Sequence, residues 1–182
     1  MTDDCHLALK AVRGDIEAFG ELVRRHQTGV YNVAYRITGN RQDSEDAAQE
    51  AFIRAYQAIG SLDPCRPPGP WFRKIAVNVC LNRLEKHPGL PLEDEYLVMY
   101  HSTTPGTGTE PESQTLERER SREIRAALLT LPPRYRAVIE LRHFQELNYA
   151  EIAETLDCPL SNVKSDLFRA RRLLAECLKE SA

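Results

Sequence analysis

Residues 149–174 read YAEIAETLDCPLSNVKSDLFRARRLL, and this stretch decides the fold of the second half of the chain. It reads as two short helices joined by a tight turn. Apolar residues at helical spacing end near Leu156, and Pro159 then interrupts the pattern because proline has no backbone N–H. Ser161 is the expected N-cap of the second helix. That helix has one stripe that we expect to be buried, made of Val163, Leu167, Ala170 and Leu174.

The remaining surface of the second helix carries amide, hydroxyl, aromatic and basic groups. Its candidate partner-binding residues are Asn162, Lys164, Ser165, Phe168, Arg169 and Arg172. Between Lys164 and Arg172 there are four basic residues and a single acid, Asp166. A helix that buries one face and offers such groups on the other fits the major groove of DNA, so the stretch predicts a helix-turn-helix. The alternative is an ordinary helical hairpin with a solvated basic face.

The composition of the chain is that of a globular protein with no metal or disulfide framework. Its 182 residues are 42% hydrophobic and 28% charged, with a formal net charge of −3, so any surface for nucleic acid must be local. The five cysteines form no Cys-x-x-Cys pair, which favours a reducing cytoplasm. We expect neither a signal peptide nor a membrane span, because no apolar run is long enough.

The N-terminal third reads as successive helices, of which residues 43–59, DSEDAAQEAFIRAYQAI, carry the strongest charge signal. We expect this helix to open at Asp43 or Ser44. Its inward face is predicted to hold Ala47, Ala48, Ala51, Phe52, Ala55, Tyr56 and Ile59. Its outward face begins with the acids Asp43, Glu45, Asp46 and Glu50. Two interpretations stay open: the acids stabilise the positive end of the helix, or they dock a basic partner.

A helix rich in cations follows a proline-rich break. The segment LDPCRPPGP, residues 62–70, predicts irregular structure, and WFRKIAVNVCLNRLEK, residues 71–86, predicts a helix. We expect one buried side, made of Trp71, Ile75, Val79 and either Leu81 or Leu84. The other side offers Arg73, Lys74, Asn78, Asn82, Arg83 and Lys86. Aromatic, amide and basic groups together suit single-stranded nucleic acid, although Trp71 could equally be a core residue.

The helical pattern lapses between residues 87 and 114, where Pro, Gly and Thr are frequent, with a short ordered patch suggested at 96–100. Two apolar stripes follow, separated by Pro132 and Pro133. They are Ile124, Ala127, Leu128 and Leu131, and then Tyr135, Val138, Ile139 and Leu141. The prediction is an all-α chain of two small helical domains, residues 1–86 and 115–182, on a flexible linker, residues 87–114. No catalytic, cofactor or metal motif is found, so we expect no enzyme, no cofactor and no metal.

Three stretches resemble the extracytoplasmic-function (ECF) class of bacterial RNA polymerase sigma factors. They are GNRQDSEDAAQEAFIRAYQAI, WFRKIAVNVCLNRL and LPPRYRAVIELRHFQELNYAEIAETLDCPLSNVKSDLFRARRLL, at residues 39–59, 71–84 and 131–174. The likeness covers nearly the whole chain, and the last stretch is the most specific. It implies a subunit that binds core RNA polymerase and directs promoter recognition and opening.

The resemblance also implies roles for individual residues. The first domain (sigma domain 2) would bind the clamp helices of the largest polymerase subunit through Asp46, Gln49 and Glu50. It would recognise and melt the minus-ten element with Trp71, Lys74, Asn78, Asn82 and Arg83, while the preceding loop holds a flipped base. The second domain (sigma domain 4) would meet the polymerase flap region. It would read the minus-thirty-five element with Asn162, Lys164, Ser165, Phe168, Arg169 and Arg172.

Two positions depart from the family pattern. Asp166 stands where relatives usually carry a basic residue, and a carboxylate there would either repel phosphate or accept from a cytosine amino group. The loop CRPPGP is richer in proline than usual, which leaves the captured base open.

Relatives are commonly silenced by an anti-sigma factor, often membrane-bound, so the resemblance implies such a partner for a cytoplasmic protein that is not itself in the membrane. A stress or envelope regulon is expected. The alternative function is a stand-alone helix-turn-helix regulator with an N-terminal sensing domain.

Overall fold

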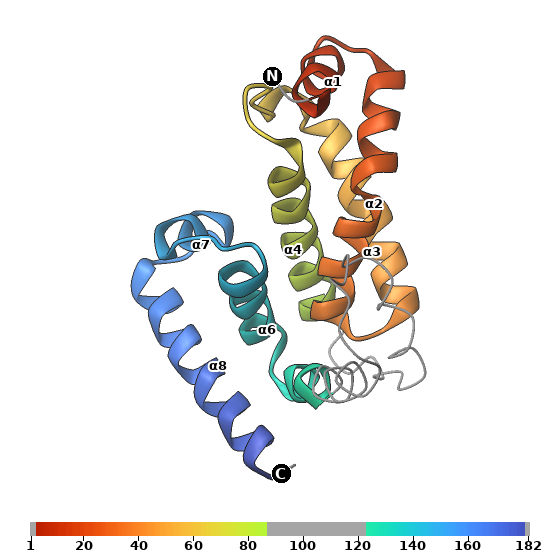
Figure 1. Cartoon of the computed structure of the whole chain (residues 1–182). Coiled ribbons are helices and arrows are strands. Elements are labelled where there is room, and N and C mark those ends of the chain that lie inside the picture. Colours follow the sequence, from red (N-terminus) through yellow and green to blue (C-terminus); the bar gives the residue numbers. More distant parts are fainter. Residues whose placement is uncertain (1–2, 87–122, 181–182) are drawn as a thin grey trace, which may run out of the picture.

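The computed structural model describes residues 3–86 and 123–180, and these are helices joined by short turns (Figure 1). The elements are α1 (Asp3–Val12), α2 (Ile16–Thr38), α3 (Arg41–Gln57), the 3-10 turn η1 (Ile59–Ser61), α4 (Pro68–Lys86), α6 (Pro133–Ile139), the π-helical turn η3 (Glu140–Phe144), α7 (Tyr149–Thr155) and α8 (Leu160–Glu180). Residues 123–130 form a further helix. The predicted linker, its suggested ordered patch and residues 115–122 lie outside the described ranges.

Helices α1 to α4 pack into one bundle, and their ends follow capping chemistry. The Asp15 carboxylate accepts from the Ala18 N–H at 3.0 Å, and Gly39 ends α2 in the left-handed region at φ 72°. Helix α3 begins two residues before the expected start, because the Asn40 side chain caps it by accepting from the Asp43 N–H at 2.9 Å. Ser44, one of the two expected starts, is instead buried inside the helix.

Helix α4 corrects two expectations. Residues 68–70 belong to its first turn, because proline has no N–H to satisfy there and its fixed φ suits the helix. The expected buried stripe is also shifted. Only Val79 of that stripe is fully buried, whereas Trp71 and Ile75 are half-buried. The buried residues are Pro68, Gly69, Phe72, Ala76, Val77, Val79 and Cys80. The pattern misled because α4 packs against α2, α3 and α6, so its apolar residues do not lie on one face.

An aromatic cluster closes the N-terminal bundle. Phe72 is 1% exposed, and its ring centroid lies 6.1 Å from that of Phe19 and 5.3 Å from that of Phe52. The His26 ring lies 5.5 Å away, and burial holds the pKa of His26 below its usual range. Tyr56 was expected in the core but is 47% exposed, with one edge against Phe19.

The C-terminal helices confirm the helix-turn-helix. Helices α7 and α8 pack together, and Val163, Leu167 and Ala170 are buried while Leu174 is partly buried. Helix α8 starts at Leu160, so the expected N-cap, Ser161, lies inside its first turn. Of the two preceding stripes, only the edge residues Ile124 and Tyr135 remain partly exposed.

A capping box starts α7. The Asn148 side chain accepts from the backbone N–H groups of Ala150 and Glu151, and the Glu151 carboxylate accepts from the Asn148 N–H at 2.7 Å. We predict that Asn148→Ala lowers the free energy of unfolding by about 1 kcal/mol, because these N–H groups lose their acceptor. Urea unfolding measures the change. Asn162→Ala, at an exposed position, should shift it by less than about 0.5 kcal/mol, and equal effects of the two changes would refute the capping role.

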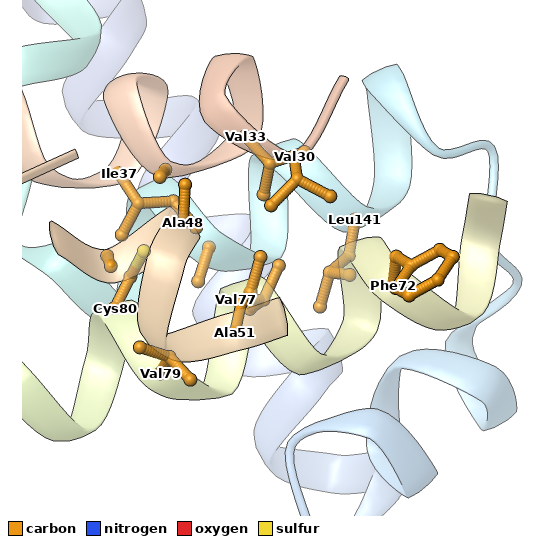
Figure 2. Close-up of a cluster of buried hydrophobic side chains, with 14 of the residues drawn as sticks. Val30, Val33, Ile37, Ala48, Ala51, Phe72, Val77, Val79, Cys80 and Leu141 are labelled. Carbon is orange, nitrogen blue, oxygen red and sulfur yellow. The ribbon is translucent and has the colours of Figure 1, made fainter. Parts of the chain in front are cut away.

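The two halves share one hydrophobic core, a contact that the sequence did not predict. Leu141 of η3 is fully buried and belongs to the same cluster as Phe72 and Val77 of α4 (Figure 2). Helix α6 packs against both α2 and α4. The C-terminal half therefore packs against the side of the N-terminal bundle that α2 and α4 form. Among the described residues, no helix has the length and hydropathy that a membrane span needs.

Candidate functional site

The acids of α3 are paired with arginines of the same bundle. Asp46 and Glu50 each lie 3.1 Å from the Arg83 guanidinium of α4, and Glu50 lies 2.5 Å from Arg54. Burial would raise the pKa of Glu50, but the hydrogen bonds from Arg83 and Arg54 bring it below the usual range. Asp46 and Glu50 therefore join α3 to α4, a structural role that neither interpretation of the sequence included. Asp46 still exposes half of its side chain, so this pairing leaves a surface for a partner.

A groove between α2 and α3 lies beside these acids. It encloses about 390 Å³ and combines an apolar floor with a polar rim, and its lining residues are Val23, Gln27, Thr28, Tyr31, Glu45, Ala48, Gln49 and Phe52. Gln49 was predicted for this surface from the sequence. The residues contributed by α2 were missed, because the sequence gives no sign of which part of α2 faces α3. An apolar groove with an acidic rim fits a partner helix that carries apolar and basic side chains.

The α4 residues predicted for minus-ten DNA do not share one environment. Trp71, Lys74 and Asn78 are half-buried, and Asn82 is exposed. Trp71 packs against the core, as the alternative interpretation proposed. Arg83 is held by the α3 acids, which leaves a third of its side chain exposed, 32%. Lys74, Asn78 and Asn82 therefore offer polar groups on the open part of this helix.

Arg73, beside Lys74, is fixed from three sides. Its Nε donates to the Gln145 side chain in the C-terminal half. Its Nη1 lies 3.0 Å from the position that a Cβ at Gly69 would take, and His26 lies 3.2 Å from that position, so a larger residue at Gly69 would press on both side chains. Burial lowers the pKa of Arg73 below its ordinary value. The sequence placed Arg73 on the polar face of α4, and the structure turns it toward the other half of the chain.

The predicted reading residues of α8 lie on its open side. Asn162, Lys164, Arg169 and Arg172 are exposed, Phe168 is 70% exposed, and Ser165 is half-buried. Arg172 is paired with Glu176 at 3.0 Å. One helix therefore buries its apolar stripe and presents all six predicted residues on the remaining surface.

Asp166 contradicts both roles suggested for it at DNA. Its side chain is 11% exposed and accepts from Arg134 Nε at 2.7 Å, so it neither repels phosphate nor reaches a base. It points toward α6 because it flanks the buried stripe, and its hydrogen bond raises the pKa of Arg134. Arg134 itself exposes 43% of its side chain. The sequence missed this residue because pairing of α6 with α8 is a tertiary contact.

The sequence also missed one further cation, Arg142, and the neighbouring His143. His143 lies near Arg142 and Arg171, and burial, followed by those two charges, lowers its pKa. Arg142 donates to the Leu147 carbonyl at 2.9 Å and so closes the turn before α7. Arg142 therefore extends the basic character of α8 onto the preceding turn, whereas the lowered pKa favours the neutral form of His143. Across the described residues, no group of three or more His, Cys, Asp or Glu side chains is placed to hold a metal ion.

Comparison with known proteins identifies the family. The model of sigma-70 region 2 matches residues 22–88, and that of sigma-70 region 4 matches residues 121–174. The chain is 37% identical over 174 residues to the ECF RNA polymerase sigma factor SigW of Bacillus subtilis, covering 92% of each protein. It is 33% identical over 180 residues to the ECF RNA polymerase sigma-E factor of Haemophilus influenzae, covering 96% of this chain and 94% of that protein.

Two solved structures share the fold. CnrH, solved in complex with the cytosolic domain of CnrY, matches with a TM-score of 0.62 at 25% identity, covering 98% of this chain and 99% of that chain. The sigma factor RpoE of Bartonella quintana, solved with the anti-sigma factor NepR, matches with a TM-score of 0.63 at 20% identity, covering 90% and 98%. The fold, the order of the two matched regions and the sequence identity to SigW and sigma-E over nearly the full length all point to one family. The chain belongs to the ECF family of RNA polymerase sigma factors, which are not enzymes but subunits that direct transcription initiation.

Proposed function

We propose a division of labour within this sigma factor, in which residues 1–86 act as domain 2, residues 115–182 act as domain 4 and residues 87–114 link them. The observation that carries this proposal is α8. It buries Val163, Leu167 and Ala170 and leaves the polar and basic side chains of the predicted reading surface available to DNA. Chemistry belongs to the polymerase, while this subunit supplies recognition and the free energy for opening.

The polymerase contact is proposed at the α2–α3 groove and the acids beside it. Asp46, Gln49 and Glu50 would meet the clamp helices of the largest subunit, with apolar side chains of the partner seated between Phe52 and Tyr31. The groove gives the partner apolar contact area, and the acids orient it. Such a division is common at interfaces, where charge sets specificity and buried anchors supply affinity.

Promoter DNA is proposed to meet two surfaces. Lys74, Asn78 and Asn82, with Trp71 and Arg83 behind them, would contact the opened minus-ten strand. Asn162, Lys164, Ser165, Phe168, Arg169 and Arg172 would read the minus-thirty-five duplex in the major groove. The polymerase flap region would hold domain 4 at the spacing of the two elements.

The experiment that tests the function is a gel shift on a promoter fragment, with and without core polymerase, followed by run-off transcription. A sigma factor shifts the promoter only with core polymerase and yields a defined transcript. A stand-alone helix-turn-helix regulator with a sensing first domain would bind the duplex unaided. That second result would overturn the proposed function.

Asn78→Ala tests the minus-ten surface. Flipping a base out of the stack costs a few kcal/mol, and contacts made after opening must offset that cost. Losing one amide contact should reduce the open bubble about tenfold, while binding to core polymerase is unchanged. Permanganate reactivity of promoter thymines measures the bubble. Gln57→Ala removes an exposed amide from α3 and should change nothing, so an undiminished bubble in Asn78→Ala would contradict the assignment.

We further propose that an anti-sigma factor, whether soluble or membrane-anchored, controls this protein in the cytoplasm. The support is the likeness to CnrH and RpoE, which were solved with CnrY and NepR. A stress or envelope regulon fits the named relatives.

A further inference from the structure

Glu140 of η3 sits at the centre of the contact between the two halves of the chain. Its carboxylate is 1% exposed and accepts from Arg36 twice, at 2.5 Å from Nε and at 3.0 Å from Nη2. The Arg36 guanidinium also lies 4.5 Å from the ring centroid of Phe144. Arg36 and Glu140 are 104 residues apart in the sequence. Glu140 therefore binds the end of α2 from the C-terminal half.

The same carboxylate is linked to a second arginine. Glu140 Oε1 accepts from the Gln145 side chain at 2.8 Å, and Gln145 in turn accepts from Arg73 Nε. Arg73 interacts with both Glu140 and Arg36 through charge, so the two guanidinium groups flank one acid. One carboxylate thus faces two cations of the N-terminal bundle.

A third arginine is buried where the two halves of the chain pack together. Arg136 of α6 is 7% exposed, and its Nε and Nη1 have no hydrogen-bond partner among the described residues. Burial lowers the pKa of Arg136 to about 10, against the opposing effect of the nearby Cys80 thiol. Two buried guanidinium nitrogens without acceptors oppose the closed arrangement, because they lose hydration without replacement.

The Arg36 guanidinium binds the Glu140 carboxylate with two N–H groups, and such a fork fits phosphate as well as carboxylate, since both present paired oxygens. Arg73 adds a second positive charge, linked to the same carboxylate through Gln145. Arg73 also adjoins Lys74 on α4, the helix proposed to meet promoter DNA. Glu140 would then occupy the position of a phosphate group.

We propose that Arg36 and Arg73 form a binding site for the phosphate backbone of single-stranded promoter DNA, which Glu140 fills while the two halves are packed together. The inference rests on the proposed contact of α4 with opened DNA. Separation of the halves removes Glu140, frees Arg36 and Arg73, and hydrates Arg136. Packing of the halves and backbone binding therefore exclude one another.

The test measures binding of the full chain, without polymerase, to a labelled single-stranded promoter oligonucleotide by fluorescence anisotropy at several salt concentrations. Glu140→Gln keeps the shape of the side chain but removes its charge, and should raise affinity roughly tenfold as the binding-competent fraction grows. Adding Arg36→Ala to that variant should abolish the gain in affinity. It should also reduce, by about 0.7, the magnitude of the slope of log affinity against log salt concentration. Arg24→Ala, on the same helix but 67% exposed, is the matched control and should keep the gain.

Gln145→Ala provides a second route, because it unlinks Arg73 and removes one hydrogen bond from Glu140 while keeping the carboxylate charge. It should also raise affinity for the oligonucleotide, and it serves as the test variant if a thermal melt shows that Glu140→Gln does not fold. The proposal is overturned if both variants bind DNA as the wild type does, or if Arg36→Ala leaves the gain intact. Run-off transcription with core polymerase and wild-type chain reports on the proposed function separately, so the two can fail independently.

Discussion

Reversal of the α3 acids, Asp46→Lys with Glu50→Lys, is expected to abolish co-elution with core polymerase. Both acids flank the groove proposed for the clamp helices, and two like charges facing a basic partner cost several kcal/mol. A loss of about 3 kcal/mol corresponds to roughly a hundredfold in Kd. Size-exclusion chromatography of sigma and core polymerase, mixed near their Kd, measures the effect.

The structure shows why this reversal needs a control. Asp46 and Glu50 both pair with Arg83, so the new lysines would also repel Arg83 and loosen α3 from α4. A triple swap, Asp46→Lys and Glu50→Lys with Arg83→Glu, restores opposite charges between the helices but keeps the outward charge reversed. If the swap fails to bind polymerase, the acid acts on the partner. If the swap restores binding, the acid acts only within the bundle, and the docking role falls.

Truncation of Phe72 is expected to have the largest effect on stability. Its ring is 1% exposed and packs against Phe19, Phe52 and His26. Phe72→Ala should therefore lower the free energy of unfolding by about 3–5 kcal/mol, because it removes buried apolar area and leaves a cavity. Urea unfolding followed by circular dichroism measures the loss.

Phe168→Ala is the matched control for this truncation. Phe168 is 70% exposed on α8, so its removal should change stability by less than about 0.5 kcal/mol. It should instead weaken binding of holoenzyme to promoters that carry a minus-thirty-five element. A comparable loss of stability in both variants would mean that the aromatic cluster does not anchor the bundle.

The sequence predicted the helix-turn-helix well because its signals are local. The buried stripe of α8 repeats at helical spacing, and Pro159 marks the turn. The sequence-based predictions failed mainly for a helix that packs against more than one neighbour. Helix α4 packs on several sides, so its stripe was misplaced, and the first turn of α4 was mistaken for a break because proline also occurs in such turns. Capping by Asn40 was missed, because Asp43 or Ser44 was expected to open the helix.

The candidate site residues show the same contrast between local features, which the sequence predicted, and tertiary contacts, which it did not. The reading surface of α8 followed from periodicity, since whatever is not buried on a single amphipathic helix is open. The state of each charge did not follow from the sequence. Asp166 looked like a group facing DNA, but it pairs with Arg134, 32 residues earlier. Arg83 looked free for DNA and is held by acids of α3.

By itself, the sequence determined the helical class, the family and the face that α8 presents, because helix periodicity, caps and family motifs are written in neighbouring residues. Only the tertiary structure decided which charges are already paired, where α2 and α3 leave a groove, and that Glu140 covers Arg36 and Arg73. Those features depend on side chains that are distant in sequence. Their meeting depends on how whole helices pack, which no local pattern specifies.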